Sequence, residues 1–227
     1  MEHISFTVPR GSVVGIIGGT GSGKSSLVSL IPHFYDVKDG RVSVFGKNVC
    51  AYDDEDLRHR IGYVQQKAVL FQGTVRSNLL WGDDSASDDD LCTALSTAQV
   101  LDIVADKGGL DAPVEQNGAN FSGGQKQRLS VARALVRKPQ ILVLDDSSSA
   151  LDYATEAAMR KAILALPYKP TLFIVSQRAS SVMCADRILV LEDGRLVGDG
   201  THKALLANCP AYCEIYHSQF SEEVTDA

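Results

Sequence analysis

The chain has 227 residues, of which 44% are hydrophobic and 22% are charged, and its formal net charge is −6. This length and composition predict a globular protein with a substantial core, and the negative charge argues against broad electrostatic binding to nucleic acid. Every apolar run is shorter than the ~18 residues that a membrane-spanning helix needs. The five cysteines have irregular spacings that fit neither a disulfide framework nor a zinc site, which indicates a reducing compartment.

Short apolar segments rich in Val, Ile and Leu alternate with helical patterns. The expected strands are Val13–Ile17, Arg41–Phe45, Ile61–Val64, Gln140–Leu144, Thr171–Val175 and Arg187–Leu191, and a further strand is expected at Ile4–Val8. Several of them are apolar without alternation, as in a parallel sheet covered on both faces. The sequence therefore predicts an α/β fold with a parallel-sheet core, formed by residues 1–73 and 139–227.

Helical patterns dominate between residues 74 and 138, where the strand signal disappears. Helices are expected over Asp88–Ala98 and Gly124–Val136, and Ser87 followed by Asp90 resembles a capping box. The acidic residues from 83 to 90 are interpreted as a solvated loop and helix cap. Residues 74–138 are therefore predicted to form an inserted α-helical subdomain.

One segment matches the pattern G-x-x-x-x-G-K-[ST] with no mismatch: Gly18-Gly19-Thr20-Gly21-Ser22-Gly23-Lys24-Ser25. It lies between the strand expected at Val13–Ile17 and a helix expected over Ser26–Ile31. A glycine-rich turn from strand to helix presents backbone N–H groups to an anion. We therefore predict that residues 18–26 bind nucleotide phosphates, with Lys24 on the β- and γ-phosphates and Ser25 on Mg²⁺. The alternative is a glycine turn that happens to precede a lysine.

Two later motifs fit the same chemistry. A second predicted anion-binding helix start is Ser122-Gly123-Gly124-Gln125, which precedes the helix at Gly124–Val136. In a head-to-tail pair of chains, this segment would lie over the γ-phosphate bound by the partner. The expected strand before Asp145 ends in that carboxylate, where a phosphate-loop protein needs an aspartate to hold Mg²⁺.

Taken together, the three motifs resemble the nucleotide-binding domain of ATP-binding cassette (ABC) transporters, and the resemblance covers nearly the whole chain, residues 1–227. It implies a P-loop NTPase fold of the RecA-like type, ATP and Mg²⁺ as cofactors, and an ATPase that drives transport. It also implies that Gln66 senses Mg²⁺ and the membrane domain, that Glu115 faces the coupling helices, and that Ser149-Ala150-Leu151-Asp152 is exchanged between paired domains.

The segments at residues 71–78 and 199–202 resemble the exporter branch, in which this domain is fused behind a membrane domain. The implied partners are a second ABC ATP-binding domain and membrane-spanning domains. The implied location is the cytoplasmic face of the cell membrane. The transported substrate is not encoded in this chain, because substrate contacts lie in the membrane domain.

Two departures from the family pattern concern catalysis. The position after the Mg²⁺ aspartate normally holds a glutamate that polarises the attacking water, but here it is Asp146, which is one methylene shorter. The family's switch histidine is replaced by Gln177, which cannot carry a proton or a positive charge. The signature is intact except that Phe121 replaces leucine. This combination resembles the degenerate-site half of a heterodimeric exporter, although a homodimer with two slow sites stays open.

A third departure concerns the adenine. The family places an aromatic residue that stacks on adenine about 20 residues or more before the phosphate loop, and no residue here matches it. The sequence therefore predicts that the first strand, the adenine-stacking loop and the membrane domain lie outside this chain. Two alternative functions remain: a nucleotide-gated dimerisation module with negligible turnover, and a soluble ABC ATPase that acts on DNA or the ribosome.

Overall fold

The computed structural model describes residues 1–147 and 150–220. The chain divides into two compact units, Met1–Asp54 with Thr171–Ala227 (the first unit) and Glu55–Pro170 (the second unit). Among the described residues, none of the helices combines the length and apolar character needed to cross a membrane. All five cysteines are free thiols.

The first unit contains four neighbouring strands in the order β10-β9-β1-β8. Its strands are β1 (Val13–Ile17), β8 (Thr171–Ser176), β9 (Arg187–Glu192) and β10 (Arg195–Gly200). The central strand β1 runs parallel to β8, with Val13 opposite Leu172, and parallel to β9, with Val14 opposite Arg187. β10 closes one edge antiparallel to β9. Because β1 is central, its carboxyl end places the following loop against two neighbouring strands.

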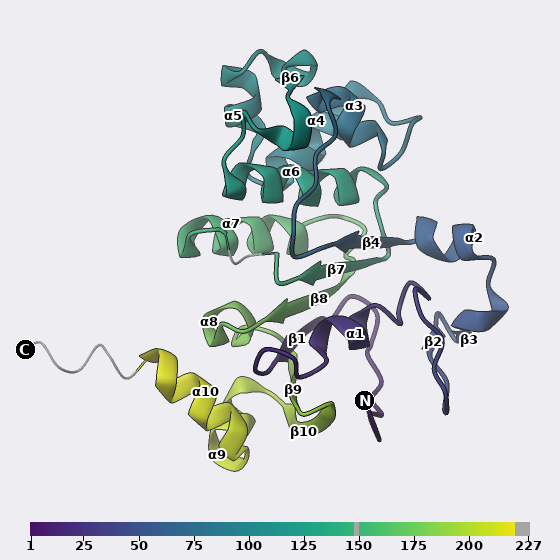
Figure 1. The fold of residues 1–227 in the computed structure, drawn as a ribbon, viewed down its shortest axis with the longest axis vertical. Coiled ribbons are helices and arrows are strands. Elements are labelled where there is room, and N and C mark those ends of the chain that lie inside the picture. Colours follow the sequence, from purple (N-terminus) through teal and green to yellow (C-terminus); the bar gives the residue numbers. More distant parts are fainter. Residues whose placement is uncertain (148–149, 221–227) are drawn as a thin grey trace, which may run out of the picture. The chain divides into compact units, whose positions relative to one another are not determined.

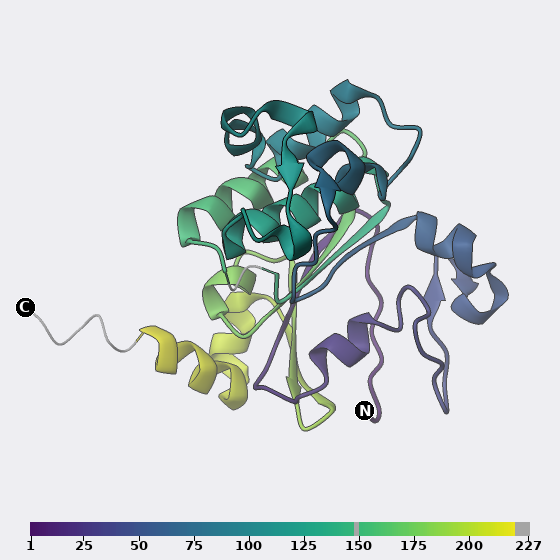
Figure 2. The ribbon, with the colours of Figure 1, turned by 45° about the horizontal axis from the view of Figure 1, so that its top comes forward.

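Helices cover both faces of this sheet. They are α1 (Lys24–Val28), α8 (Ala179–Val182), α9 (His202–Asn208) and α10 (Pro210–Phe220). Figure 2 shows α1 on one side of the strands and α8, α9 and α10 on the other. Every residue of β1 and β8 is buried, which explains why these strands are apolar without alternation.

The second unit contains the parallel pair β4 (Ile61–Val64) and β7 (Ile141–Asp145), with Ile61 opposite Ile141. Its helices are α2 (Asp54–His59, which begins at the boundary of the units), α3 (Val75–Leu80), α4 (Asp88–Thr97), α5 (Leu101–Asp106), α6 (Gly123–Val136) and α7 (Tyr153–Leu164). In Figure 1, α3, α4 and α5 gather around α6, whose apolar face is buried against α4, α3 and β4.

Small elements complete the chain. They are the antiparallel pair β2 (Ser43–Val44) and β3 (Lys47–Asn48), the antiparallel pair β5 (Gly73–Thr74) and β6 (Pro113–Val114), and the 3₁₀ helices η1 (Val49–Ala51), η2 (Gly109–Asp111) and η3 (Gln116–Gly118). The pair β5 and β6 is a correction, because two short strands lie in a region where the sequence showed no strand signal. Two-residue strands are too short to produce a recognisable alternation.

The predicted α/β fold with a parallel-sheet core is confirmed, but two expected strands are wrong. The segment Ile4–Val8 is not a strand, because an alternating pattern forms one only where the backbone finds a ladder partner. The strand expected at Arg41–Phe45 shrinks to β2, which pairs with β3 in a hairpin. Phe45 and Gly46 turn the chain with φ values of 53° and 79°, as two-residue hairpin turns require.

The helices α1 and α9 each end shortly before a proline. The helix expected at Ser26–Ile31 begins earlier, at Lys24, and ends at Val28. Ile31 precedes Pro32, and a residue before proline is biased away from helical backbone angles. Cys209 lies between α9 and α10, directly before Pro210.

Candidate functional site

The glycine-rich loop of the first unit folds around its own lysine. Lys24 is buried, and its Nζ donates to the carbonyl oxygens of Gly18 at 2.8 Å and Gly19 at 2.7 Å. It also lies 3.4 Å from the Ser22 hydroxyl. A buried ammonium needs such acceptors, so the loop backbone holds the charge at the place where a phosphate would be bound.

Two glycines are required by geometry. A Cβ on Gly18 would lie 2.1 Å from the carbonyl oxygen of Leu191, so only glycine fits where β1 leaves the sheet. Gly23 caps the start of α1 with a φ of 96°, in the left-handed region that favours glycine. The pattern G-x-x-x-x-G therefore marks one close approach and one backbone reversal.

The structure brings Gln177 to this loop. The Thr20 hydroxyl lies 3.2 Å from Oε1 of Gln177, which follows β8 directly. The turn that carries Gln177 is held by Gln219 of α10. The Gln219 amide donates to the carbonyl of Gln177 at 2.8 Å and accepts from the backbone N–H of Ala179 at 2.8 Å. Gln219 thus fixes the backbone on both sides of Arg178.

Two carboxylates end β7 in the second unit, and each has a side-chain partner. Asp145 is buried, and its Oδ2 accepts a hydrogen bond from the Tyr63 hydroxyl at 2.8 Å. The Oδ2 of Asp146 accepts from the Gln66 amide at 2.7 Å. Asp146 has a φ of 47°, a left-handed conformation that aspartate tolerates better than most residues. The structure therefore brings together Gln66 and Asp146, which are far apart in the sequence.

The second glycine motif forms a capping box at the start of α6. The Ser122 Oγ accepts from the Gln125 N–H at 3.3 Å, and the Ser122 N–H donates to Oε1 of Gln125 at 2.9 Å. Gly124 packs so closely that a Cβ would lie 2.9 Å from the Ala150 carbonyl. The first-turn N–H groups of this helix of 14 residues, including that of Gly123, have no acceptor within the helix except where the capping box supplies one. This arrangement suits an anion.

The remaining predicted positions are placed as follows. Ser25 and Ser26 are exposed in the first turn of α1. Phe121 is buried beneath the Lys107 ammonium, which lies 4.9 Å from its ring centre. Asp152 caps α7 through Thr155, and those hydrogen bonds lower its pKa. Ser149 of the predicted exchanged loop lies outside the described residues.

Two residues that contact the site, Tyr63 and Gln219, are not assigned to it by any sequence motif. Tyr63 carries the one hydroxyl within the apolar strand β4, and a hydroxyl at that point of a buried strand is a usable signal for a polar partner. Gln219 offers no comparable signal, because it is an exposed polar residue near a helix end and its partners lie 40 or more residues away.

The Ser25 and Gln177 positions belong to the first unit, while Gln66, Asp145, Asp146 and the Ser122 motif belong to the second. Within the first unit the phosphate loop and Gln177 form one group. Within the second unit the carboxylates and Gln66 form another.

Comparisons with known proteins agree on one family. The family model described as ABC transporter matches residues 1–149. An uncharacterized ABC transporter ATP-binding protein of Bacillus subtilis is 44% identical over 228 residues, which cover 100% of this chain and 39% of that protein. An ATP-dependent lipid A-core flippase of Haemophilus ducreyi is 39% identical over 98% of this chain and 38% of its own length.

A solved structure gives the same result. The structure of a bacterial Atm1-family ABC exporter with ATP bound matches with a TM-score of 0.91 and 37% sequence identity. The match covers 96% of this chain and 38% of that one. The chain thus spans about two fifths of the length of these relatives. The predicted P-loop NTPase fold and the resemblance to exporter ATP-binding domains are confirmed.

Proposed function

Because the chain belongs to the ABC transporter family, we propose that it is an ATP-binding and ATP-hydrolysing motor domain that powers an exporter through ATP-driven head-to-tail dimerisation. The observation that carries this proposal is the phosphate loop. Its motif is complete, it follows a buried central strand, and its lysine is enclosed by the carbonyls of Gly18 and Gly19. ATP would replace these carbonyls as the partner of Lys24, because charge-assisted bonds to phosphate are the stronger ones.

We assign ATP contacts to residues 18–26, and Mg²⁺ to the Ser25 hydroxyl, the Asp145 carboxylate and the Gln66 amide. These are oxygen donors, which Mg²⁺ prefers. Bound Mg²⁺ would neutralise charge on the phosphates. Tyr63 would hold the Asp145 carboxylate in one orientation through its 2.8 Å hydrogen bond. Ser122, Gly123, Gly124 and Gln125 would bind the γ-phosphate held by the partner's loop.

We further propose that this chain's own site turns over slowly. Asp146 stands where the family has glutamate, and its shorter side chain lies farther from the attacking water. A misplacement of about 1 Å can cost on the order of 10²-fold in rate. Gln177 reaches the phosphate loop through Thr20, but its amide offers a neutral hydrogen bond where a histidine offers a charge.

The 2.7 Å hydrogen bond between Gln66 and Asp146 favours a second candidate function. An Asp146 carboxylate occupied by an amide is a weaker base, so the chain would act as a nucleotide-gated dimerisation module with negligible turnover. The two candidates differ only in the hydrolysis rate, and both require ATP binding.

The partners that we propose are a second ABC ATP-binding domain, as a heterodimer, and membrane-spanning domains. The chain would then work at the cytoplasmic face of the cell membrane. The relatives support this assignment, because one is named a flippase and another structure is an exporter with ATP bound. Whether the partner is a second copy or a different chain decides between two slow sites and one slow site.

The motif at Ser122 allows a test in trans. Ser122→Ala should lower ATP turnover at the partner's site, while the affinity of this chain for ATP stays nearly unchanged. A matched control is Ser87→Ala, which removes the same type of capping box from α4 without touching the motif. The assay is steady-state ATPase activity of the assembled pair beside a nucleotide titration of this chain alone. Equal losses for both variants would reduce Ser122 to a helix cap and contradict the proposed role.

A further inference from the structure

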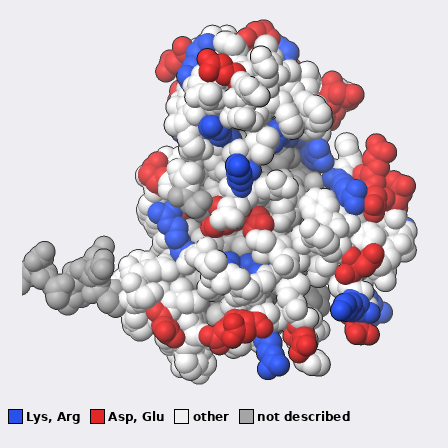
Figure 3. Space-filling model, in the orientation of Figure 1, with Lys and Arg blue, Asp and Glu red and all other residues white. Residues whose placement is uncertain are grey.

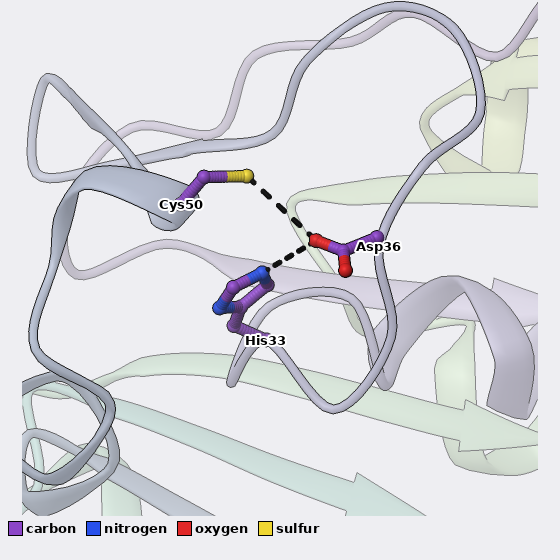
Figure 4. A group of neighbouring side chains, drawn as sticks. All are labelled: His33, Asp36 and Cys50. Atoms are coloured by element: carbon purple, nitrogen blue, oxygen red, sulfur yellow. Dashed lines mark hydrogen bonds and ion pairs between the residues drawn. The ribbon is translucent and has the colours of Figure 1, made fainter.

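A second group of side chains lies in the first unit, away from the residues assigned to ATP. His33 follows α1, Asp36 lies three residues further on, and Cys50 lies in η1. In Figure 4 the imidazole and the thiol converge on one carboxylate oxygen of Asp36. The distances to this Oδ1 are 2.9 Å from His33 Nε2 and 3.9 Å from Cys50 Sγ. All three ligand atoms lie within 4.8 Å of one another.

These distances bracket the separation between ligand atoms in a tetrahedral metal site. Ligand atoms about 2.0–2.3 Å from a tetrahedral zinc ion lie about 3.3–3.7 Å from one another. The distances measured here, 2.9 Å and 3.9 Å, lie on either side of that range. Asp36 and Cys50 are exposed, so small side-chain rotations suffice to bring all three atoms to the required separation. Imidazole, thiolate and carboxylate together suit zinc better than the hard cations Mg²⁺ and Ca²⁺.

Asp54 orients the His33 ring through the other ring nitrogen, Nδ1. Its Oδ1 lies 3.1 Å from His33 Nδ1, on the opposite edge of the ring from Asp36. A carboxylate on the second nitrogen is the usual companion of a metal-bound histidine, because it fixes the tautomer with Nε2 as the ligand. The His33 side chain is only 18% exposed, so the ring is held by packing as well.

The surroundings favour a cation. Asp53 and Asp54 follow one another where α2 begins, and Figure 3 shows acidic side chains gathered there. Cys50 is also held in place, because its backbone N–H donates to the Asn48 side chain at 3.2 Å. This bond fixes the backbone at Cys50 and leaves the exposed thiol free to rotate toward Asp36.

We propose that His33, Asp36 and Cys50 bind one zinc ion, with water as the fourth ligand and Asp54 as the residue that orients His33. Binding releases the thiol proton of Cys50 to solvent. The ion joins the segment after α1 to η1. Cysteine spacing alone does not reveal this site, because only one of its ligands is a cysteine.

The test is a calorimetric titration of the chain with zinc chloride at mildly alkaline pH. Asp36 and Asp54 raise the pKa of His33, and a protonated imidazole does not ligate. We expect saturable binding of one ion. Cys50→Ser and His33→Gln should each weaken it by about 10-fold or more, and Asp54→Asn by about 10- to 100-fold. Cobalt in place of zinc should give a thiolate charge-transfer band that disappears in Cys50→Ser.

Cys184→Ser is the matched control, since Cys184 is another exposed thiol, and its zinc affinity should equal that of the unmodified chain. Zinc should also raise the unfolding temperature of the unmodified chain but not of Cys50→Ser. Melting curves of the metal-free variants check that each is folded. Equal zinc affinity with and without the Cys50 thiol, or titrations without saturable binding, would overturn the proposal. Neither outcome bears on ATP binding, because no residue is shared with that site.

Discussion

The phosphate loop and the carboxyl end of β7 are held in place by different kinds of interaction. In the loop, Lys24 is bound by main-chain carbonyls within six residues of itself, and two glycines provide the required backbone shape. At the end of β7, Asp145 and Asp146 are bound by side chains that lie 80 or more residues away. The conformation of the loop is therefore determined by its own short sequence, and the position of the two carboxylates is determined by contacts that form only when the chain folds.

This difference explains which substitutions each region tolerates. A loop made of backbone contacts depends on glycine and lysine at fixed spacing, so a motif search finds it. A carboxylate held by a distant side chain, as Asp146 is held by Gln66, has no local motif that fixes its position. Substitutions in the two regions should therefore have separable effects.

Restoring the family's residues should raise turnover. Asp146→Glu extends the carboxylate by one methylene, and Gln177→His returns a group that can carry charge beside Thr20. We expect up to about 10²-fold faster hydrolysis for Asp146→Glu, with the double variant faster than either single variant. The measurement is the steady-state ATPase activity of the chain. Asp146→Asn is the control, because it shows how much of the remaining activity depends on the Asp146 carboxylate as a base. Rapid turnover by the unmodified chain without a partner would contradict the slow-site proposal.

Removing charge at the end of β7 should affect Mg²⁺ more than the nucleotide. Asp145→Asn should weaken ATP binding by about 10- to 100-fold with Mg²⁺ present and far less in EDTA. Tyr63→Phe removes the hydrogen bond to that carboxylate and leaves its charge, so the same pattern with a loss of about 2- to 10-fold is expected. Titrations with ATP in the presence of Mg²⁺ and in EDTA measure both losses of affinity. Identical losses of ATP affinity with and without Mg²⁺ would show that Asp145 is not a ligand of Mg²⁺.

How far the sequence predicts this molecule depends on the range of the interactions. The bounds of β1 and β4 were predicted correctly, because a continuous apolar run bounded by polar residues marks a buried strand. The segment Ile4–Val8 has an equally good pattern but no ladder partner, so its strand was predicted wrongly. The phosphate loop follows from one motif. The hydroxyl of Tyr63 in a buried strand signals a polar partner without identifying it, and Gln219 gives no signal, because only folding brings both residues to their partners.

The two hydrogen bonds made by the Gln219 side chain should influence the rate of ATP hydrolysis, because they position the turn that carries Gln177. Gln219→Ala removes both 2.8 Å hydrogen bonds to the turn after β8. We expect kcat to fall by about 2- to 10-fold while KM for ATP changes little, because the turn is misplaced and the phosphate loop is intact. Ser218→Ala, one residue away on α10, is the control and should match the unmodified chain. A rise in KM without a change in kcat would assign Gln219 to nucleotide binding instead.

The smallest effect concerns stability at the start of α4, outside both regions. Lys138 at 2.8 Å, together with the Ser87 cap, lowers the pKa of Asp90 from 3.8 to about 2. A depressed folded-state pKa contributes stability that is fully present above pH 3.8 and is lost as the pH falls toward about 2. Asp90→Asn should therefore be less stable than the unmodified chain near neutral pH, and the difference should vanish in that acidic window. Urea unfolding at several pH values measures it, and a constant difference would exclude the ionised carboxylate as its cause.

The central claim is that this chain binds ATP with Mg²⁺ through its phosphate loop, and a calorimetric titration of the chain beside Lys24→Ala tests it most directly. The account predicts saturable binding of one nucleotide to the unmodified chain and an affinity about 10- to 100-fold weaker for Lys24→Ala, since a charge-assisted contact to phosphate is lost. Equal affinities for the two proteins, with both shown to be folded, would contradict it.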